Sequence, residues 1–396
     1  MLEFDAARRQ ILDSCSALST ERVELRHALG RVLREDLSAA TPLPPFDYSA
    51  MDGFCLASAD LAGAPPYELS VSGESRTGHP CPPLTRGAAL RIFTGGRLPA
   101  GADCVVIQEN TERTADRVRL LVAPLPGDNV RRRGEDLAEG EVALRAGTRL
   151  GPFQLALAAA LDRDRLLVTR APRVVVLSTG DELRAPGAPG SADSIPESNS
   201  VALAALSTLA GASVESGERL GDDAARTTEC VLAALERADV VITVGGMSVG
   251  DYDLVRPALE RAGVDLDFWK VAIQPGKPFA FGRRAGRFVL GLPGNPVSAQ
   301  VTFVLFGLPL LRALQGDRAP LPRNFRVELD APLSRKAGRL GVYRATLDGP
   351  RAHIAAGQSS GATTSLARAD ALVFVPAEST AIAAGTWLDA IRLDDC

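Results

Sequence analysis

Residues 173–316 alternate strand-like and helical patterns, and this alternation constrains the fold more than any other feature. The runs "RVVVLSTG" (173–180), "DVVITVGG" (239–246) and "RFVLGL" (287–292) are almost continuously apolar, which is typical of strands buried on both faces. Helical patterns lie between these runs, and a long helical pattern begins at Pro296. Strands that alternate with helices predict an α/β fold with a largely parallel sheet and right-handed crossovers.

The remainder of the chain divides into smaller parts. Apolar spacing predicts helices over residues 2–35, around Leu2 to Leu12 and again around Val23 to Val32. Short β-like runs separated by Gly, Pro and Asp fill residues 66–125, and similar runs fill the last 75 residues. We therefore expect a multidomain α/β protein with an inserted small β domain and a second β domain at the end. The predicted parts are a helical or linking domain (1–45 plus 141–170), an inserted β domain (46–140), the α/β domain (171–318) and a C-terminal β domain (319–396).

Composition excludes several classes of protein. A chain of 396 residues with a net charge of −4 gives no electrostatic reason to expect nucleic acid or an anionic membrane as a partner. No apolar run reaches the roughly 18 residues that a membrane span needs, and the N-terminus shows no signal peptide, so we expect a cytoplasmic location. Six scattered cysteines and three unpaired histidines argue against a structural zinc site or a disulfide framework.

Three loops follow apolar strands of the α/β segment and gather small and acidic residues. They read "STGDEL" (178–183), "GGMSVGDYD" (245–253) and "GLPGNPVSAQ" (291–300). Ligands of open α/β sheets bind at the carboxyl ends of the strands, so these loops are expected to form one site. Small residues let a ligand approach backbone N–H groups, and a helix that begins at Asn295-Pro296 offers an anion site. Lys270 and Lys277 add positive charge that suits phosphate, and the carboxylates of these loops suit Mg²⁺. The sequence therefore predicts a phosphate-bearing ligand with Mg²⁺.

Motifs of several common enzyme classes do not occur. The chain has no G-x-x-x-x-G-K-[ST] phosphate loop and no G-x-S-x-G nucleophile elbow. "GGMSVG" does not match G-x-G-x-x-G and follows the third strand of the segment, which disfavours a dinucleotide-binding fold.

The stretch "PLPPFDYSAMDGF" (42–54) holds an acidic residue in a stiffened backbone. Three prolines precede the pair Asp52-Gly53. An Asp before Gly commonly forms a simple turn, so a structural role for Asp52 competes with a functional one.

Seven motifs together carry a family resemblance. They are "PLPPFDYSAMDGF", "RIFTGGRLPAGADCVVIQE", "VRRRGED", "LSTGDEL", "VGGMSVGDYD", "FWKVAIQPGKPFAFG" and "GLPGNPVSA". In this order, from about residue 40 to 300, they resemble the molybdopterin molybdenumtransferase (MoeA) family, whose eukaryotic relatives include the E domain of gephyrin. A weaker match, "GQSSGATTSL", follows in the C-terminal part.

The resemblance implies both an architecture and a reaction. The α/β domain would be similar to the adenylyltransferase MogA, with a three-layer arrangement, and the C-terminal domain would be β-barrel-like. Members of the family act as homodimers that take adenylylated molybdopterin, insert molybdate at the dithiolene and release AMP. Their active site lies across the dimer interface, so Asp52 of one subunit would face the strand-end loops of the other. A MogA-type adenylyltransferase would be the source of the substrate.

The resemblance also suggests roles for individual residues. Where some members have a lysine before "PGKP", this chain has Gln274, which removes one positive charge near the expected oxyanion site. The positions that match the family's catalytic acids and hydroxyl are Asp52, Thr94, Asp136, Glu182, Asp222 and Asp253, of which Glu182, Asp222 and Asp253 would hold the metal. The positions expected to bind the substrates are Arg131, Ser178, Gly180, Gly245, Gly246, Ser248, Lys270, Lys277, Pro293, Asn295, Pro296, Ser298, Arg344 and Ser360.

Alternative interpretations remain open at this point. Asp222 and Asp253 each precede a helical run and would also serve as helix caps. The run Arg131 to Arg133 would also suit a solvated face. Two rival functions are the adenylyltransferase step itself, and a dimeric scaffold or binding module of the same fold without turnover.

Overall fold

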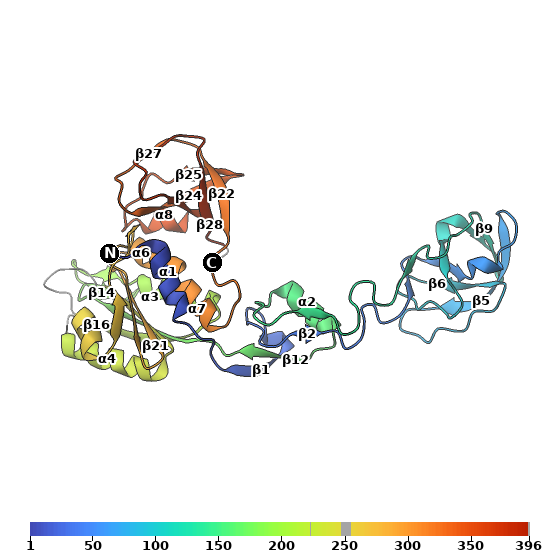
Figure 1. The fold of residues 1–396 in the computed structure, drawn as a ribbon, viewed down its shortest axis with the longest axis horizontal. Helices are drawn as coiled ribbons and strands as arrows, with labels where there is room; N and C mark the ends of the chain where they lie inside the picture. Colours follow the sequence, from blue (N-terminus) through green and yellow to red (C-terminus); the bar gives the residue numbers. More distant parts are fainter. Residues whose placement is uncertain (222, 247–254, 395–396) are drawn as a thin grey trace. The chain divides into compact units, whose positions relative to one another are not determined.

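The computed structural model describes residues 1–221, 223–246 and 255–394 (Figure 1). The chain forms two compact units. The large unit comprises Met1–Glu35, Ala146–Leu155 and Asp164–Cys396, and the small unit comprises Asp36–Arg145 and Ala156–Arg163. The finer four-part division stays a prediction.

A six-stranded sheet forms the centre of the large unit. Its strand order is β16-β13-β17-β21-β20-β18. The first four strands are parallel, and β20 pairs antiparallel with both β21 and β18, which confirms the prediction of a mostly parallel sheet. The strands are β13 (Arg173–Thr179), β16 (Ser213–Leu220), β17 (Val240–Val244), β18 (Asp265–Phe268), β20 (Ala280–Arg284) and β21 (Arg287–Leu292).

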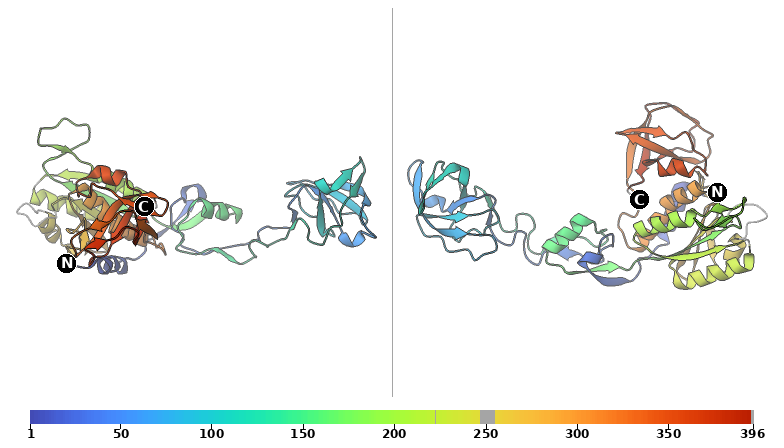
Figure 2. Two further views of the ribbon diagram at one scale, coloured as in Figure 1. Left: turned by 90° about the horizontal axis from the view of Figure 1, so that it is seen from above. Right: turned by 180° about the vertical axis from the view of Figure 1, so that it is seen from behind.

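Helices cover both faces of this sheet, as Figure 2 shows for α3 and α4. Alternate residues of β13 serve opposite faces, because successive side chains of a strand point to opposite sides. Val174 and Val176 pack in one cluster with α1 and α3, whereas Val175 and Leu177 pack in another with α4 and α5. The helices are α1 (Phe4–Asp13), α3 (Asn199–Leu209), α4 (Ala224–Arg237) and α5 (Val255–Arg261). The predicted three-layer α/β arrangement is thus confirmed.

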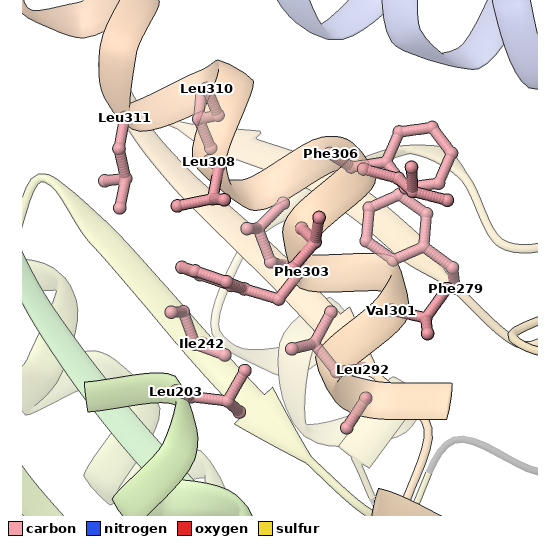
Figure 3. Packing of buried hydrophobic residues seen from close by; sticks show 14 of the residues in the cluster. Leu203, Ile242, Phe279, Leu292, Val301, Phe303, Phe306, Leu308, Leu310 and Leu311 are labelled. Carbon is pink, nitrogen blue, oxygen red and sulfur yellow. The ribbon is translucent and has the colours of Figure 1, made fainter. Parts of the chain in front are cut away.

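The long helix from Pro296 lies in the core. It consists of α6 (Pro296–Thr302), a π-helical turn (Phe303–Gly307) and α7 (Leu308–Leu314). Figure 3 shows Phe303 pointing from this helix toward Ile242 of β17, while the ring of Phe306 stacks on Phe279 at 4.6 Å between centroids. The helix is long and apolar enough to cross a membrane, which the shorter apolar run in the sequence did not indicate, but 83% of its apolar window is buried inside the fold. It is a core helix of the large unit.

The second helix predicted near the N-terminus is wrong. Residues Thr20–Glu24 form strand β1, followed by a 3₁₀ turn at Leu25–His27. β1 pairs antiparallel with β12 (Arg165–Thr169), and Leu33 forms a further bridge to Val168. Pairing with a distant strand satisfies the backbone here and overrides a sparse apolar spacing, as tertiary context often does.

The C-terminal part of the large unit is a closed barrel. Each of its five main strands pairs with two others, in the ring β24-β25-β22-β28-β26 and back to β24. This confirms the expected barrel-like domain. The strands are β22 (Asn324–Leu329), β24 (Leu340–Asp348), β25 (Arg351–Ile354), β26 (Ala371–Val375) and β28 (Trp387–Arg392), with α8 (Thr363–Ala367) between β25 and β26. Short strand pairs elsewhere in the unit are β14 (Leu183–Arg184) with β15 (Ile195–Pro196), β19 (Ile273–Gln274) with β24, and β23 (Leu333–Ser334) with β27 (Ala381–Ile382).

The small unit is built around a second six-stranded sheet, in the order β7-β4-β6-β5-β9-β8. Two short pairs, β2 with β11 and β3 with β10, lie before and after it in the chain. The strands are β2 (Leu37–Ser38), β3 (Tyr48–Ser49), β4 (Gly53–Leu56), β5 (Tyr67–Ser75), β6 (Ala88–Ile92), β7 (Cys104–Ile107), β8 (Thr111–Arg113), β9 (Arg117–Leu120), β10 (Val130–Arg131) and β11 (Val142–Leu144). Helix α2 (Pro152–Ala160) follows β11.

Candidate active site

The three predicted loops meet at the carboxyl ends of their strands. Gly245, after β17, has φ = +90°, and a Cβ there would lie 2.6 Å from the carbonyl oxygen of Thr179 at the end of β13. A Cβ at Gly294, after β21, would lie 3.4 Å from the Cα of Gly245. The loops therefore pack backbone against backbone, and a side chain at position 245 would push them apart.

These loops line a cavity of about 510 Å³, which we call the strand-end cavity. It gathers most of the predicted substrate-binding residues of the α/β domain. It also includes residues that the sequence did not single out, among them Glu197, Asn199 and Pro278. The predicted residues that line it are Ser178, Gly180, Glu182, Gly245, Gly246, Pro293, Asn295 and Pro296.

Asn199 fixes one wall of this cavity. It is the first residue of α3 and only 8% exposed. Its Nδ2 donates to the carbonyl oxygen of Gly294 at 2.8 Å, while its Oδ1 is buried without a hydrogen-bond partner among the described residues. Glu197, also buried, accepts from the N–H of Ser200 at 2.8 Å. In the sequence, "ESN" (197–199) resembles an ordinary helix start. Nothing near it in the sequence indicates that Asn199 contacts a loop 95 residues away.

Glu182 is the predicted metal ligand that the structure describes. Its side chain is exposed, lies over Gly180 and makes no hydrogen bond with the described residues. Three further predicted residues, Asp222, Ser248 and Asp253, lie outside the described residues. Within the described part of the chain, no group of three or more acidic, histidine or cysteine residues is placed to hold a metal ion.

A second cavity, of about 450 Å³, adjoins the first, and Pro278 lines both. We call it the cationic cavity, because Lys277, Arg339 and Arg344 line it and no Asp or Glu does so among the described residues. Ser298 of α6 and Ser360, both predicted to bind substrate, complete its wall with Gln274. Four residues that the resemblance suggested for substrate binding, Lys277, Ser298, Arg344 and Ser360, therefore line one cavity.

Arg344 is a buried positive charge without a negative partner among the described residues. Its side chain is 0% exposed on β24. Nη2 donates to the carbonyl oxygens of Gly357 at 2.9 Å and Ser359 at 3.0 Å, and Nε donates to Ser365 Oγ at 3.1 Å. Nη1 is buried without a partner among the described residues. Burial lowers the pKa of Arg344 from its usual value. Such a group is costly unless an anion compensates it.

The N-terminus of α6 was predicted to offer an anion site. The N–H of Val297, in the first turn, donates instead to the carbonyl oxygen of Ser360 at 3.1 Å. One of the backbone N–H groups at the start of the helix therefore binds the loop that carries Ser360. This hydrogen bond helps to fix the wall of the cationic cavity.

Lys270 lies in neither cavity. It lines a separate hollow with Trp269 and Arg256, whose guanidinium lies 5.3 Å from the centre of the indole ring. The carbonyl oxygen of Lys270 accepts from the N–H of Leu2. The structure thus separates Lys270 from Lys277, although the two are close in the sequence.

In the small unit, Asp52 is held by Thr94. Its Oδ1 accepts from the backbone N–H of Thr94 at 2.7 Å and from its Oγ1 at 2.8 Å. These bonds hold the pKa of Asp52 below its ordinary value. Gly53 has no space for a Cβ, because the atom would overlap the carbonyl oxygen of Val106 on β7. The carboxylate is therefore fixed by a tertiary contact across 42 positions, not by its own turn.

The other predicted residues of the small unit lie on its surface. Arg131 pairs with Glu135 at 3.0 Å, and each of the next two arginines pairs with another acid. Asp136 is exposed, and its backbone N–H donates to the carbonyl oxygen of Leu43. The basic run is thus largely neutralised within the small unit.

Burial raises the pKa of the thiols of Cys55 and Cys104, in the small unit, and of Cys15 to about 12. A thiolate is the reactive form of cysteine, so these three residues are suited to packing and not to catalysis.

Family models match nearly the whole chain. The MoeA N-terminal region (domain I and II) matches residues 2–161, and a probable molybdopterin binding domain matches residues 175–313. The MoeA C-terminal region (domain IV) matches residues 326–393.

Individual relatives agree with these models. The chain is 38% identical to the molybdopterin molybdenumtransferase of Haemophilus influenzae over 348 residues, 87% of this chain and 85% of that protein. It is also 38% identical to molybdopterin molybdenumtransferase 2 of Mycobacterium tuberculosis over 398 residues, covering 96% and 97% of the two chains. The crystal structure of a molybdopterin biosynthesis MoeA protein from Pyrococcus horikoshii matches with a TM-score of 0.87 at 29% identity, covering 99% of this chain and 100% of that one. The chain therefore belongs to the molybdopterin molybdenumtransferase (MoeA) family.

Proposed function

We propose that this protein inserts molybdenum into adenylylated molybdopterin, using molybdate and releasing AMP, to form the molybdenum cofactor. It belongs to a family of transferases of molybdenum cofactor biosynthesis. The observation that carries the proposal is the pair of adjoining cavities that share Pro278. One is lined by close-packed backbone and an exposed carboxylate, and the other by cations without a described acid.

The strand-end cavity would take the phosphoanhydride part of the substrate. Its glycine-lined loops leave backbone open to a phosphate, and Asn199 keeps the third loop in place. Glu182 supplies one carboxylate, and Mg²⁺ favours one or two carboxylates together with substrate phosphates, so this donor set fits Mg²⁺. Asp222 and Asp253 are proposed as further ligands. When bound, the metal would neutralise charge on the phosphates during cleavage.

The cationic cavity would hold molybdate. A tetrahedral dianion is bound best by charge-assisted hydrogen bonds from arginine, lysine and hydroxyl donors. Arg344, Lys277, Ser298 and Ser360 supply these types, and the buried Nη1 of Arg344, which has no hydrogen-bond partner among the described residues, would gain one from an entering acceptor. Because the two cavities adjoin, the oxyanion would wait beside the pterin while AMP is still attached.

We also propose that the enzyme is a homodimer. The large unit exposes apolar side chains on three segments, namely Leu29, Phe153, and Val201 with Leu209 on α3, and Phe153 is 85% exposed. The segments are tied together, because Arg149 donates to the carbonyl oxygens of Gly30 and Ala210, and Gly30 donates to Leu150. An exposed apolar area of this kind suits a protein interface.

In this dimer, the small unit of one subunit would serve the strand-end cavity of the other. Asp52, held ionised by Thr94, would orient water or the metal ion, and Asp136 and Arg131 would lie close to the substrate. A MogA-type adenylyltransferase would supply the adenylylated substrate, and we expect the reaction to take place in the cytoplasm.

The direct test is AMP release from adenylylated molybdopterin by the purified protein with Mg²⁺, with and without molybdate. We expect release that depends on molybdate, is abolished by a chelator of Mg²⁺ and is lost in Asp52→Ala. AMP release that ignores molybdate would contradict metal insertion. Synthesis of adenylylated molybdopterin from ATP would instead identify an adenylyltransferase. The absence of both activities would indicate a scaffold.

A mixture of two inactive variants tests the shared site. Asp52→Ala and Glu182→Ala subunits, refolded together, would form heterodimers in which one of the two sites has both carboxylates. Activity should return in the mixture and stay absent in each variant alone. If the mixture stays inactive while light scattering shows dimers, each site is built from one subunit. The variant Leu209→Asp should dissociate the dimer, with Thr114→Asp in the small unit as the matched surface control.

A further inference from the structure

Gln274 and Arg339 form a contact at the wall of the cationic cavity. Nη2 of Arg339 donates to Oε1 of Gln274 at 3.4 Å, and both residues line the cavity. They are 65 residues apart in the chain and are brought together because β19 pairs with β24, Gln274 opposite Gly341.

The backbone around Arg339 is anchored. The carbonyl oxygen of Arg339 accepts from the guanidinium of Arg335, which also donates to the carbonyl oxygens of Val375 and Pro376. Arg335 is thus used by the barrel, whereas Arg339 directs its half-buried side chain to the cavity. Arg339 forms no ion pair with an acid among the described residues. Its positive charge is available to a ligand.

We infer that Arg339 is an oxyanion-binding residue of this enzyme and that Gln274 positions it. This inference rests on the proposed function, since it assigns residues to the proposed molybdate site. With Arg339, the cavity presents three cations, Lys277, Arg339 and Arg344, to a dianion. Arginine offers two parallel N–H donors to a tetrahedral oxyanion, which the single ammonium of a lysine does not.

Glutamine suits this role because it is neutral. A lysine at position 274 would face the guanidinium of Arg339 with a like charge, which would push the guanidinium away. Lysine at 274 and a tethered arginine at 339 are therefore two alternative ways to supply one positive charge at this wall. The pair predicts a specific rescue. Lysine at position 274 should raise the affinity for molybdate only when Arg339 is absent.

The experiment is equilibrium binding of molybdate to the full-length protein by calorimetry, with molybdate-dependent AMP release measured in parallel. Arg339→Gln should weaken molybdate binding about tenfold or more, as expected for loss of a hydrogen bond from a charged group. Gln274→Ala should weaken binding by a smaller factor and raise the KM for molybdate with kcat unchanged. Lys336→Gln removes an exposed positive charge from the same segment outside the cavity lining and should bind as the parent does.

The double variant Gln274→Lys/Arg339→Gln is the decisive arm. Its affinity should recover most of the loss, whereas Gln274→Lys alone should not improve on the parent. Equal melting temperatures of all variants would exclude misfolding as the cause of the loss. If the parent binds molybdate and Arg339→Gln binds it equally well, or if the double variant is no better than Arg339→Gln, the inference is wrong. If the parent itself binds no molybdate, the proposed function fails and not merely the role of Arg339.

Discussion

Two buried charges of the large unit are treated in opposite ways. Asp239, next to the start of β17, is 2% exposed and forms ion pairs with three arginines. Arg170 binds its two oxygens at 2.6 and 2.9 Å, and Arg287 and Arg173 bind from the neighbouring strands. Burial alone would raise the pKa of Asp239, but hydrogen bonds from Arg170 and Arg173 outweigh it and hold the pKa well below its ordinary value. Arg344 is equally buried, yet no described carboxylate faces it.

This difference separates a charge that stabilises the fold from one that waits for a ligand. The arginines around Asp239 come from β13, β21 and the segment before β13. The cluster therefore joins these strands at their amino-terminal ends, whereas the strand-end cavity lies at their carboxyl ends. Nothing in the structure requires a ligand there. At Arg344 the hydrogen bonds to backbone carbonyls hold the guanidinium in place but do not neutralise it. A buried charge is therefore informative about function only when its partners are counted.

The largest effect is expected from Asp239→Asn. Removing one partner of a buried ion pair leaves uncompensated charge, and the free energy of unfolding should fall by about 3–5 kcal/mol. Because the folded pKa is depressed, Asp239 stabilises the protein above its unfolded pKa, and this contribution disappears as the pH falls through the lower folded value. Urea unfolding at pH 7 and at acidic pH checks both points. Unchanged stability at pH 7 would refute the contrast with Arg344.

Arg344→Met should affect ligand binding more than stability, the opposite of Asp239→Asn. Molybdate affinity should fall at least tenfold, since a charge-assisted bond contributes about 1.5–3 kcal/mol. The free energy of unfolding should stay close to that of the parent, because the variant also removes an unpaired buried charge. Arg326→Met on the exposed face of the barrel is the matched control. A large loss of stability with intact molybdate binding would show that Arg344 is a structural residue like Asp239.

Asn199→Ala tests a group intermediate between Asp239 and Arg344, since one atom of its amide is hydrogen-bonded and the other has no partner among the described residues. Loss of the bond to Gly294 should cost about 1 kcal/mol in the free energy of unfolding. It should also weaken AMP binding, because the third loop of the strand-end cavity loses its anchor. Calorimetry with AMP gives the second quantity. Thr208→Ala on the same helix keeps AMP binding if the effect is specific to the cavity.

Thr94→Val addresses a carboxylate at the surface and should have the smallest effect on stability. Loss of the hydroxyl donor should raise the pKa of Asp52 toward its ordinary value, while the backbone N–H of Thr94 still lowers it. If ionised Asp52 is needed, the acidic limb of the pH profile of AMP release shifts to higher pH. Thr114→Val, elsewhere in the small unit, should leave the profile in place. The same shift of the pH profile in both variants would show that the effect does not depend on Asp52.

The sequence predicted features that depend on long uniform patterns. The buried strands of the α/β segment were evident because four or five consecutive apolar residues leave few alternatives, and the three loops followed from strand direction. Residues 20–27 were misjudged because a strand that pairs 145 positions away competes with a local helical spacing. Asn199 carried no local sign of its contact with Gly294, and the contact of Gln274 with Arg339 depends on strand pairing across 65 residues. The resemblance alone suggested Arg344, since burial without a counter-charge is a property of three-dimensional structure.

The longer segment of the small unit, residues 36–145, begins and ends on paired strands. Leu37–Ser38 pairs with Val142–Leu144, so the two ends of a segment longer than 100 residues lie side by side within the small unit. A segment with adjoining ends can be lengthened, shortened or exchanged without moving the chain on either side, because the host chain needs only to close a short gap. Evolution can therefore alter the surface that carries Asp52 while the large unit keeps its cavities unchanged. The insert is a replaceable cassette, and chimeras that exchange residues 36–145 between relatives offer a practical way to mix substrate preferences.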